Sequence, residues 1–312
     1  MRKRSAALIF LLTVLVSIPA CGSKDQQDAG GGSFPIPNQN WVLAEETLEI
    51  PGLHSQGLAT LPALGPTDFV FTSRFTVDHT RDGKIVALNF AFSPELLDLG
   101  FDHLGDPDAN GTLIYGALED NSDPVVNPYH RGFVLFDAET LSIAGWANDP
   151  GRPDNPADED CPWAAVSPDG QWVVTGQWDP MQTVIVYRAE KLMSGHTVRP
   201  EAEIPMDMPF SDVQGCDFDG PRVLVCASDD ADAGRLLYAI ILSGPLEGDA
   251  VPRLTAHVEA IFPAPVPEMQ CTQPQEVEGV DVDGDTLRVL VIGSCQIDEH
   301  LYRYERCTRN CP

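Results

Sequence analysis

A short segment recurs five times along the sequence, and this recurrence constrains the fold more than any other feature. Aligned on their last residue, the copies lie about fifty residues apart, at 54–57, 102–105, 160–163, 212–215 and 276–279. We call the stretches that begin with them repeat units 1 to 5. Each copy precedes a strand-like stretch, a polar turn, an apolar strand and usually a third strand with Tyr or Phe. A supersecondary unit repeated at this period indicates stacked blades or a solenoid.

Repeat unit 3 shows the scheme most clearly. Apolar stretches at 163–166, 171–176 and 183–187 predict three strands, and Ser167-Pro168-Asp169-Gly170 predicts a tight turn between the first two. Pro presets a φ angle that such turns need, and Gly accepts a positive φ. This turn, followed by an alternating apolar strand, resembles the repeats of bacterial propellers of the TolB-like and YVTN type. The resemblance implies a propeller fold and no particular activity.

The fixed period also separates the candidate architectures. Short strands between Gly, Pro and Asp turns fit a sandwich, a barrel or a propeller, but only the propeller repeats itself. Unit 1 is the least regular, with strands at 68–71 and 85–88. The strand-rich segment 41–50 has no unit of its own, so we expect it to supply the outer strand of the final blade. We therefore predict an all-β, closed propeller of five blades, or six if 245–270 contains a degenerate one.

The N-terminus predicts export and a membrane anchor. Residues 1–20 contain a positive start, an apolar core and small residues before Cys21, as a secretory signal peptide does. Ile18-Pro19-Ala20-Cys21 resembles the lipobox of bacterial lipoproteins, which implies cleavage before Cys21, acylation of Cys21 and contact with a lipid bilayer. The absence of Asp at position 22 favours the outer membrane of a Gram-negative envelope. Residues 21–40 read as a flexible linker and 41–312 as the propeller domain.

Charge limits the partners of this domain. The chain has 47 Asp and Glu against 19 Lys and Arg, a formal net charge of −28. A protein of this sign repels nucleic acids, so we exclude DNA and RNA as partners. Cations, neutral sugars and basic protein surfaces remain compatible, and we expect a protein or a small molecule as the ligand.

Cysteine usage fits an oxidising compartment. With Cys21 acylated, seven of the eight cysteines remain, so one thiol stays free or pairs between chains. Cys216 and Cys226 flank a predicted hairpin that turns near 219–221, which places them opposite each other on facing strands. We predict a disulfide between them.

Candidate site residues follow from the repeats, because the loops that enter the innermost strands of a propeller surround its channel. Three places before the aligned position the chain carries an imidazole or a carboxyl group in every unit, and neighbouring positions are also polar. Crowded carboxylates suit a hard cation such as calcium, although acidic turn residues are also common in an acidic protein. The candidates for the channel mouth are His54, Asp102, Asp160, Asp212 and Glu276, with Gln56, His103, Gln214 and Glu278 beside them.

Two classes of function remain after this reasoning. The sequence has no Gly-x-Ser-x-Gly elbow and no phosphate-binding glycine loop, and it assembles no recognisable nucleophile, base and orienting group. We therefore favour a non-enzymatic, membrane-anchored propeller that binds a ligand or serves as an interaction scaffold. The alternative is a calcium-dependent or carboxylate-based hydrolase of glycosidase or lactonase/esterase type, with its site at the central channel. The spacing of the carboxyl groups distinguishes these hypotheses.

Overall fold

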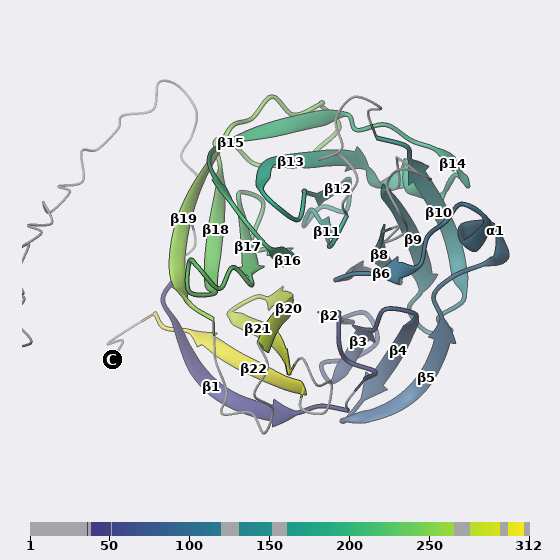
Figure 1. Ribbon diagram of the computed structural model, residues 1–312, viewed down its shortest axis with the longest axis horizontal. Coiled ribbons are helices and arrows are strands. Elements are labelled where there is room, and N and C mark those ends of the chain that lie inside the picture. The colour runs from purple at the N-terminus through teal and green to yellow at the C-terminus, as the bar shows by residue number, and fades with distance from the viewer. Residues whose placement is uncertain are drawn as a thin grey trace, which may run out of the picture. The chain divides into compact units, whose positions relative to one another are not determined.

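The compact unit Ile36–Pro312 is an all-β fold in which antiparallel sheets surround a common centre (Figure 1). This is the β-propeller that the repeats predict. The structure is a computed structural model, and it describes residues 36, 39–50, 52–119, 131–151, 161–264, 275–293 and 299–308. The predicted signal peptide, Cys21, most of the predicted linker and Asp160 lie outside these residues.

Repeat unit 1 forms a four-stranded antiparallel meander. Its strands, in order from the centre outward, are β2 (Gly57–Thr60), β3 (Asp68–Thr72), β4 (Thr76–Arg81) and β5 (Lys84–Phe90). Asp82 and Gly83 join the last two with φ angles of 50° and 68°, as a two-residue hairpin turn requires. The apolar pattern of the sequence did not predict β4, because Asp78 and His79 interrupt it. Both are buried, and His79 is paired with Asp68 at 2.5 Å.

Repeat unit 2 builds a sheet in the order β6-β8-β9-β10, and the short β7 also pairs with β8. The one-turn helix α1 (Pro94–Asp98) precedes it, capped by the Ser93 side chain, which accepts a hydrogen bond from the backbone of Leu96. The turn at Gly111, with a φ of 62°, joins β7 to β8 as the Asn-Gly pair predicts. The strands are β6 (His103–Leu104), β7 (Asp108–Asn110), β8 (Leu113–Glu119), β9 (Arg131–Asp137) and β10 (Ile143–Asp149).

Repeat units 3 and 4 share a sheet of eight strands, β11-β12-β13-β15-β19-β18-β17-β16. A parallel bridge between Met206 and Ala256 joins the two antiparallel halves through their outer strands. Counted as two blades, this sheet agrees with the five units of the repeat, although the blade number stays a prediction. The strands are β11 (Ala165–Val166), β12 (Trp172–Thr175), β13 (Met181–Arg188), β15 (Ala202–Phe210), β16 (Val213–Phe218), β17 (Val223–Ser228), β18 (Leu236–Leu242) and β19 (Ala256–Pro263).

Two short elements connect β13 to β15. A 3₁₀ turn, η2 (Ala189–Met193), follows β13, and β14 (His196–Thr197) then pairs in parallel with β10 of the preceding unit. These contacts tie unit 3 to unit 2 at the outside of the ring. Among the described residues no helix is long and apolar enough to cross a membrane.

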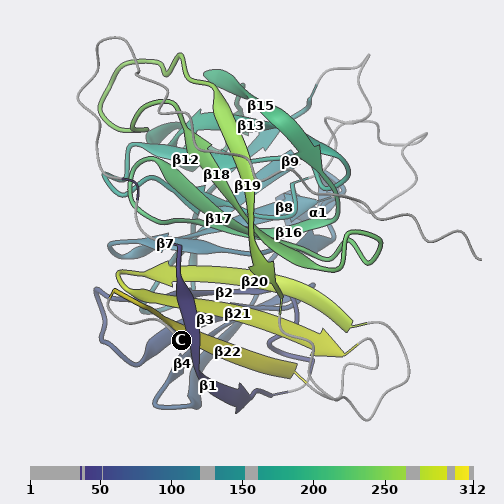
Figure 2. The same ribbon diagram turned by 90° about the vertical axis from the view of Figure 1, so that its left-hand side faces the viewer.

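The N-terminal strand closes the ring, as predicted. β1 (Trp41–Leu48) pairs antiparallel with β22 (Glu299–Arg306), so the first strand of the domain becomes the outer strand of the last unit (Figure 2). The inner strands of this sheet are β20 (Gln275–Asp283) and β21 (Thr286–Gly293), joined by the Asp283-Gly284-Asp285 turn. A sheet that contains both ends of the domain leaves no open seam in the ring.

The apolar core consists of five clusters, and each is shared by two neighbouring units. Alternation along β9 shows the reason, because Val134 and Phe136 face unit 1 while Phe133 and Leu135 face unit 3. A strand in a propeller is buried on both faces, which explains the continuous apolar runs of the second and third strands. The side chains that hold the fold together therefore lie between sheets.

The predicted disulfide is present. Cys216 and Cys226 face each other across β16 and β17 with their Cα atoms 4.0 Å apart. Cys307 is also disulfide-bonded, while Cys161 is a free, buried cysteine. Burial raises the pKa of the Cys161 thiol to about 12, so this group stays protonated at neutral pH.

Candidate functional site

The side chain of Asp106 lies at the centre of the ring, between the inner strands of units 1, 4 and 5. This residue is fully buried, and its two carboxyl oxygens accept hydrogen bonds from the backbone of Leu58 at 3.0 Å and of Val280 at 3.4 Å. Three glycines of the repeat lie against it, since a Cβ atom at Gly57, Gly215 or Gly279 would come within 2.2–2.8 Å of its carboxyl oxygens. The glycine that ends most copies of the repeat is therefore explained by close packing around one buried carboxyl group.

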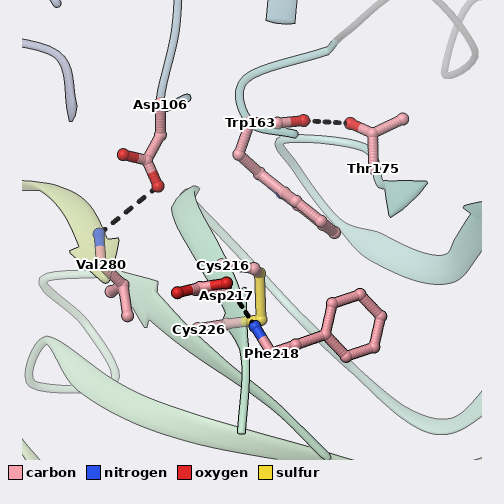
Figure 3. Close-up of a disulfide and its surroundings, with 8 residues drawn as sticks. All are labelled: Asp106, Trp163, Thr175, Cys216, Asp217, Phe218, Cys226 and Val280. Carbon is pink, nitrogen blue, oxygen red and sulfur yellow. Dashed lines mark hydrogen bonds between the residues drawn. A yellow bond between two sulfur atoms is a disulfide. The ribbon is translucent and has the colours of Figure 1, made fainter. Parts of the chain in front are cut away.

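Unit 3 carries Trp163 in place of this glycine. Figure 3 shows its side chain beside Asp106 and the Cys216–Cys226 disulfide, and it belongs to the apolar cluster that contains both cysteines. Its backbone oxygen accepts a 2.6 Å hydrogen bond from the hydroxyl of Thr175. The indole ring fills space that is left between units 3 and 4 near the axis.

Three further buried aspartates join the inner strands of neighbouring units. Each accepts a backbone hydrogen bond from the next unit along the ring, and the donors are Val166 to Asp108 (2.6 Å), Val282 to Asp217 (2.6 Å) and Thr60 to Asp281 (2.7 Å). Asp281 also pairs with Arg288 at 2.7 Å. Burial, followed by the charges of the other aspartates, raises the pKa of Asp217 well above its usual range and that of Asp108 to about 7.

A cavity of about 500 Å³ opens at the mouth of the channel. Its walls come from units 1 to 5, which are brought together only by closure of the ring. Carboxyl groups, amides, an imidazole and one large aromatic side chain form most of the surface. The lining residues are Gln56, His103, Gly105, Glu119, Pro162, Trp178, Asp212, Gln214, Asp229, Glu276 and Glu278.

The predicted ring of residues reaches this cavity only in part. Asp212 and Glu276 line it, and Asp160 lies outside the described residues. His54 does not line it, because it is fully buried between Glu49 (3.1 Å) and Asp78 (3.3 Å).

The ring of His54 stacks on Phe71 at 3.9 Å, and burial, which lowers the pKa, is outweighed by its two carboxyl partners, which raise it to about 9. Asp102 is also directed elsewhere and pairs with Arg74 at 2.9 Å. His54 and Asp102 therefore have structural partners in this fold instead of a place at the mouth.

The neighbouring positions are all at the cavity. Gln56, Gln214 and Glu278 directly precede the aligned glycine, whereas in unit 2 His103 lines the cavity and the following Leu104 is buried. The lining residue of unit 2 is thus shifted by one position along its strand, and a shift of one residue moves a side chain to the other face of the strand. The structure therefore places the mouth mainly at the last polar residue before the inner strand.

Three lining residues that the repeat alignment does not include belong to a second set of loops. Glu119 ends β8, Trp178 follows β12 and Asp229 follows β17, so all three come after the second strand of their unit. In a meander the loop after the second strand returns to the end at which the first strand begins. A search for polar or aromatic residues at this point of each unit would have found them.

The carboxyl groups give the cavity a negative charge, and basic side chains neutralise this charge only in part. His103 contacts Glu119 at 3.1 Å and also hydrogen-bonds Gln56, while Arg235 pairs with Asp229 at 2.8 Å. Burial, opposed by Arg235, raises the pKa of Asp229 to about 6.

Two other lining carboxyl groups are shifted in the same direction. Burial and the neighbouring charges of Asp179 and Asp230 raise the pKa of Asp212. Burial and the proximity of Glu276 raise the pKa of Glu278 well above its usual range. Burial in the cavity thus favours the neutral form of Asp212, Asp229 and Glu278.

The geometry bears on calcium binding and on carboxylate-based hydrolysis, the two chemistries that the sequence left open. No group of three His, Cys, Asp or Glu side chains among the described residues is arranged to hold a metal ion, so these residues do not fit a calcium site. Glu276 and Glu278 both line the cavity from β20. A pair of carboxyl groups, which glycosidases use as acid and base or nucleophile, is therefore present there.

Neither a protein-family model nor a curated protein sequence matches this chain. Among solved structures, the PQQ-bound aldose sugar dehydrogenase from Streptomyces coelicolor is similar at 12% identity, with a TM-score of 0.38 and coverage of 84% of this chain and 98% of that chain. KlHsv2 with loop 6CD replaced by a Gly-Ser linker is similar at 11% identity, with a TM-score of 0.36. That match covers 63% of this chain and about half, 55%, of the other. Neither likeness assigns an activity or a ligand to this chain.

Proposed function

We propose that this protein is a membrane-anchored, extracytoplasmic β-propeller that binds a ligand in the acidic cavity at the mouth of its central channel. The observation that carries the proposal is the cavity itself. It gathers amide, carboxyl, imidazole and indole groups from all five units around one concave space. A concave site with a few converging polar groups is the usual form of a small-molecule site.

The lining favours binding over catalysis. Among the described residues that line the cavity there is no Ser, Thr, Cys, Lys or Tyr to act as a nucleophile. His103 and Glu119 form a base-like pair, but the described cavity wall offers them no hydroxyl or thiol to activate. A binding or scaffold role needs only the groups that are present.

The proposed location rests on the N-terminus and on the oxidised cysteines. The lipobox-like Ile18-Pro19-Ala20-Cys21 supports acylation and an outer-membrane position. The Cys216–Cys226 disulfide agrees with a compartment beyond the cytoplasm. The linker behind Cys21 would let the propeller reach its ligand at some distance from the bilayer.

A carboxylate-based hydrolase is the second candidate, and one observation favours it. Burial and the charge of Glu276 raise the pKa of Glu278, and both residues line the cavity, so two carboxyl groups are available there, as acid/base catalysis requires. Incubation of the full-length protein with chromogenic glycosides and lactones tests this. Release of product that disappears in Glu278→Gln would favour hydrolysis over simple binding.

Cavity filling tests the binding proposal directly. Gln214→Trp places an indole in the cavity, and Gln182→Trp is the matched control because Gln182 is exposed on β13. Full-length proteins would be screened by thermal shift against amines, sugars, calcium and basic peptides. We expect a ligand that stabilises the wild type and the control but not Gln214→Trp. Equal stabilisation of all three would place binding elsewhere.

A further inference from the structure

Glu278 differs from every other buried carboxyl group that the structure describes. It is 4% exposed and lines the cavity, and no hydrogen-bond donor among the described residues contacts its carboxyl oxygens. Burial and the neighbouring charge of Glu276 raise its pKa, which favours its protonated form. Glu278 therefore lines an open cavity without the donor that a buried carboxylate needs.

The other nine buried carboxyl groups in the described ranges all have donors. Each accepts at least one hydrogen bond from a backbone amide, a hydroxyl group or a nitrogen-bearing side chain, as buried carboxylates do in general. These groups are Asp68, Asp78, Asp106, Asp108, Asp149, Asp217, Asp219, Asp281 and Glu299. Glu278, the exception, faces an open cavity, so we expect a ligand to supply the missing donor.

The side chains around Glu278 favour a positively charged donor. Its charged neighbours are Glu276 on its own strand, Asp229 just after β17 and Asp106 at the axis. Arg235 pairs with Asp229 at 2.8 Å and not with Glu278.

Other lining residues add further negative charge. They include Asp212 and Glu119, and the imidazole of His103 lies between Glu119 and Gln56. A neutral hydroxyl group would leave this concentration of negative charge unbalanced, whereas a cation would balance it.

Trp178 provides a surface for the apolar part of such a ligand. Its side chain is 43% exposed at the cavity, and its backbone oxygen accepts a 3.1 Å hydrogen bond from Val213, which holds it beside β16. An exposed indole beside carboxylates is the usual pairing for recognition of organic ammonium and guanidinium groups.

We propose, building on the binding role above, that the cavity takes an organic cation whose ammonium or guanidinium N–H groups donate the hydrogen bonds that Glu278 lacks. The carboxylates of Glu278 and Glu276 both accept from the ligand, and Trp178 covers its carbon chain. A proton carried by Glu278 in the empty site passes to solvent, so one cation enters as one proton leaves. Affinity should therefore rise with pH as Glu278 and Asp229 lose their protons.

Titration calorimetry on the full-length protein tests this with 1,4-diaminobutane as the probe. Measurements in phosphate and in ACES, which both buffer near pH 6.5 and differ in ionisation enthalpy, give the number of protons released. We expect binding that weakens with added salt, about one proton released per ligand near pH 6.5, and tighter binding at pH 8 than at pH 5.5. Glucose and calcium chloride are titrated in parallel.

Three variants locate the effect. Glu278→Gln should weaken diamine binding about tenfold or more and abolish proton release, and Asp212→Asn, at the more open wall, should weaken binding less. Glu247→Gln, an exposed substitution outside the cavity, should match the wild type. Circular dichroism and thermal unfolding confirm that each variant folds.

The outcomes separate this inference from the proposed function. If glucose binds but the diamine does not, and Gln214→Trp blocks glucose, the cavity remains the binding site but its ligand is not an organic cation. Diamine binding without proton release, or unchanged in both Glu278→Gln and Asp212→Asn, would overturn the exchange of proton for ligand. A failure of every probe class, together with a null result in the cavity-filling screen, would overturn the binding role itself.

Discussion

Asp281 and Thr60 lie 221 residues apart in the sequence, yet the backbone nitrogen of Thr60 donates a 2.7 Å hydrogen bond to the carboxyl group of Asp281. The hydroxyl group of Thr60 donates a second one at 3.1 Å. These contacts join the inner strand of the last unit to that of the first. The ring is thus closed at its axis by a side chain and at its rim by the pairing of β1 with β22.

The pairing of Asp108 with Val166, and of Asp217 with Val282, suggests how this closure responds to pH. Burial raises the pKa of Asp108 from about 3.9 in an unfolded chain to about 7. A carboxyl group with a raised pKa contributes stability that is fully present below the unfolded value and is lost as the pH rises through the folded value. We expect the free energy of unfolding to fall between about pH 4 and pH 8, as urea denaturation would measure.

The variant Asp108→Asn isolates this contribution, because its amide oxygen still accepts a backbone hydrogen bond but does not titrate. At acid pH, where Asp108 is protonated, the wild type and the variant should have similar free energies of unfolding. As the pH rises, the wild type should lose stability relative to the variant. A difference that is constant from pH 4 to pH 8 would contradict a raised pKa at Asp108.

The packing of glycine against Asp106 predicts a sharp intolerance of larger residues. In Gly57→Ala the new Cβ atom would lie 2.4 Å from the backbone Cα atom of Asp106, so the backbone must shift. We expect destabilisation by about 1–3 kcal/mol or more, measured by chemical denaturation. Gly244→Ala is the control, since its Cβ would meet only the end of the Leu254 side chain, and we expect a change within about 0.5 kcal/mol.

The disulfide closes a short loop, with a sequence separation of 10. Restricting the unfolded chain over a loop of this length contributes about 2–3 kcal/mol in the chain-entropy model. The double variant Cys216→Ala/Cys226→Ala should lose about that much stability relative to the oxidised protein. Reduction with dithiothreitol should bring the wild type toward the variant, and a wild type that is equally stable in both states would argue against a contribution from this bond.

Acylation of Cys21 is the prediction on which the proposed location depends. A signal peptide that ends in Ile18-Pro19-Ala20-Cys21 should be cleaved before Cys21, and several acyl chains should retain the protein at the membrane. Intact-mass analysis of the membrane fraction should find a chain that begins at Cys21 with added lipid. Cys21→Ser should lose this mass and partition with the soluble fraction, while continued membrane retention of Cys21→Ser would refute a lipid anchor.

Local chain signals determined the architecture. The recurring segment, the Asp-Gly and Asn-Gly turns and the alternation of apolar residues predicted a propeller closed by its N-terminal strand. The same signals placed Cys216 opposite Cys226. These features depend on turn geometry and on the two-residue period of a strand, and both can be recognised within a dozen residues of sequence.

Tertiary structure decided which residues meet at the centre. Gln214 and Glu278 reach the cavity, whereas His54 is withdrawn into a buried pair, because one step of register or one turn before a strand reverses the direction of a side chain. Asp229 and Trp178 join the site from loops that resemble ordinary connections in the sequence. The carboxyl groups acquire their shifted pKa values only when the ring closes, since burial and mutual charge arise between units that the sequence keeps far apart.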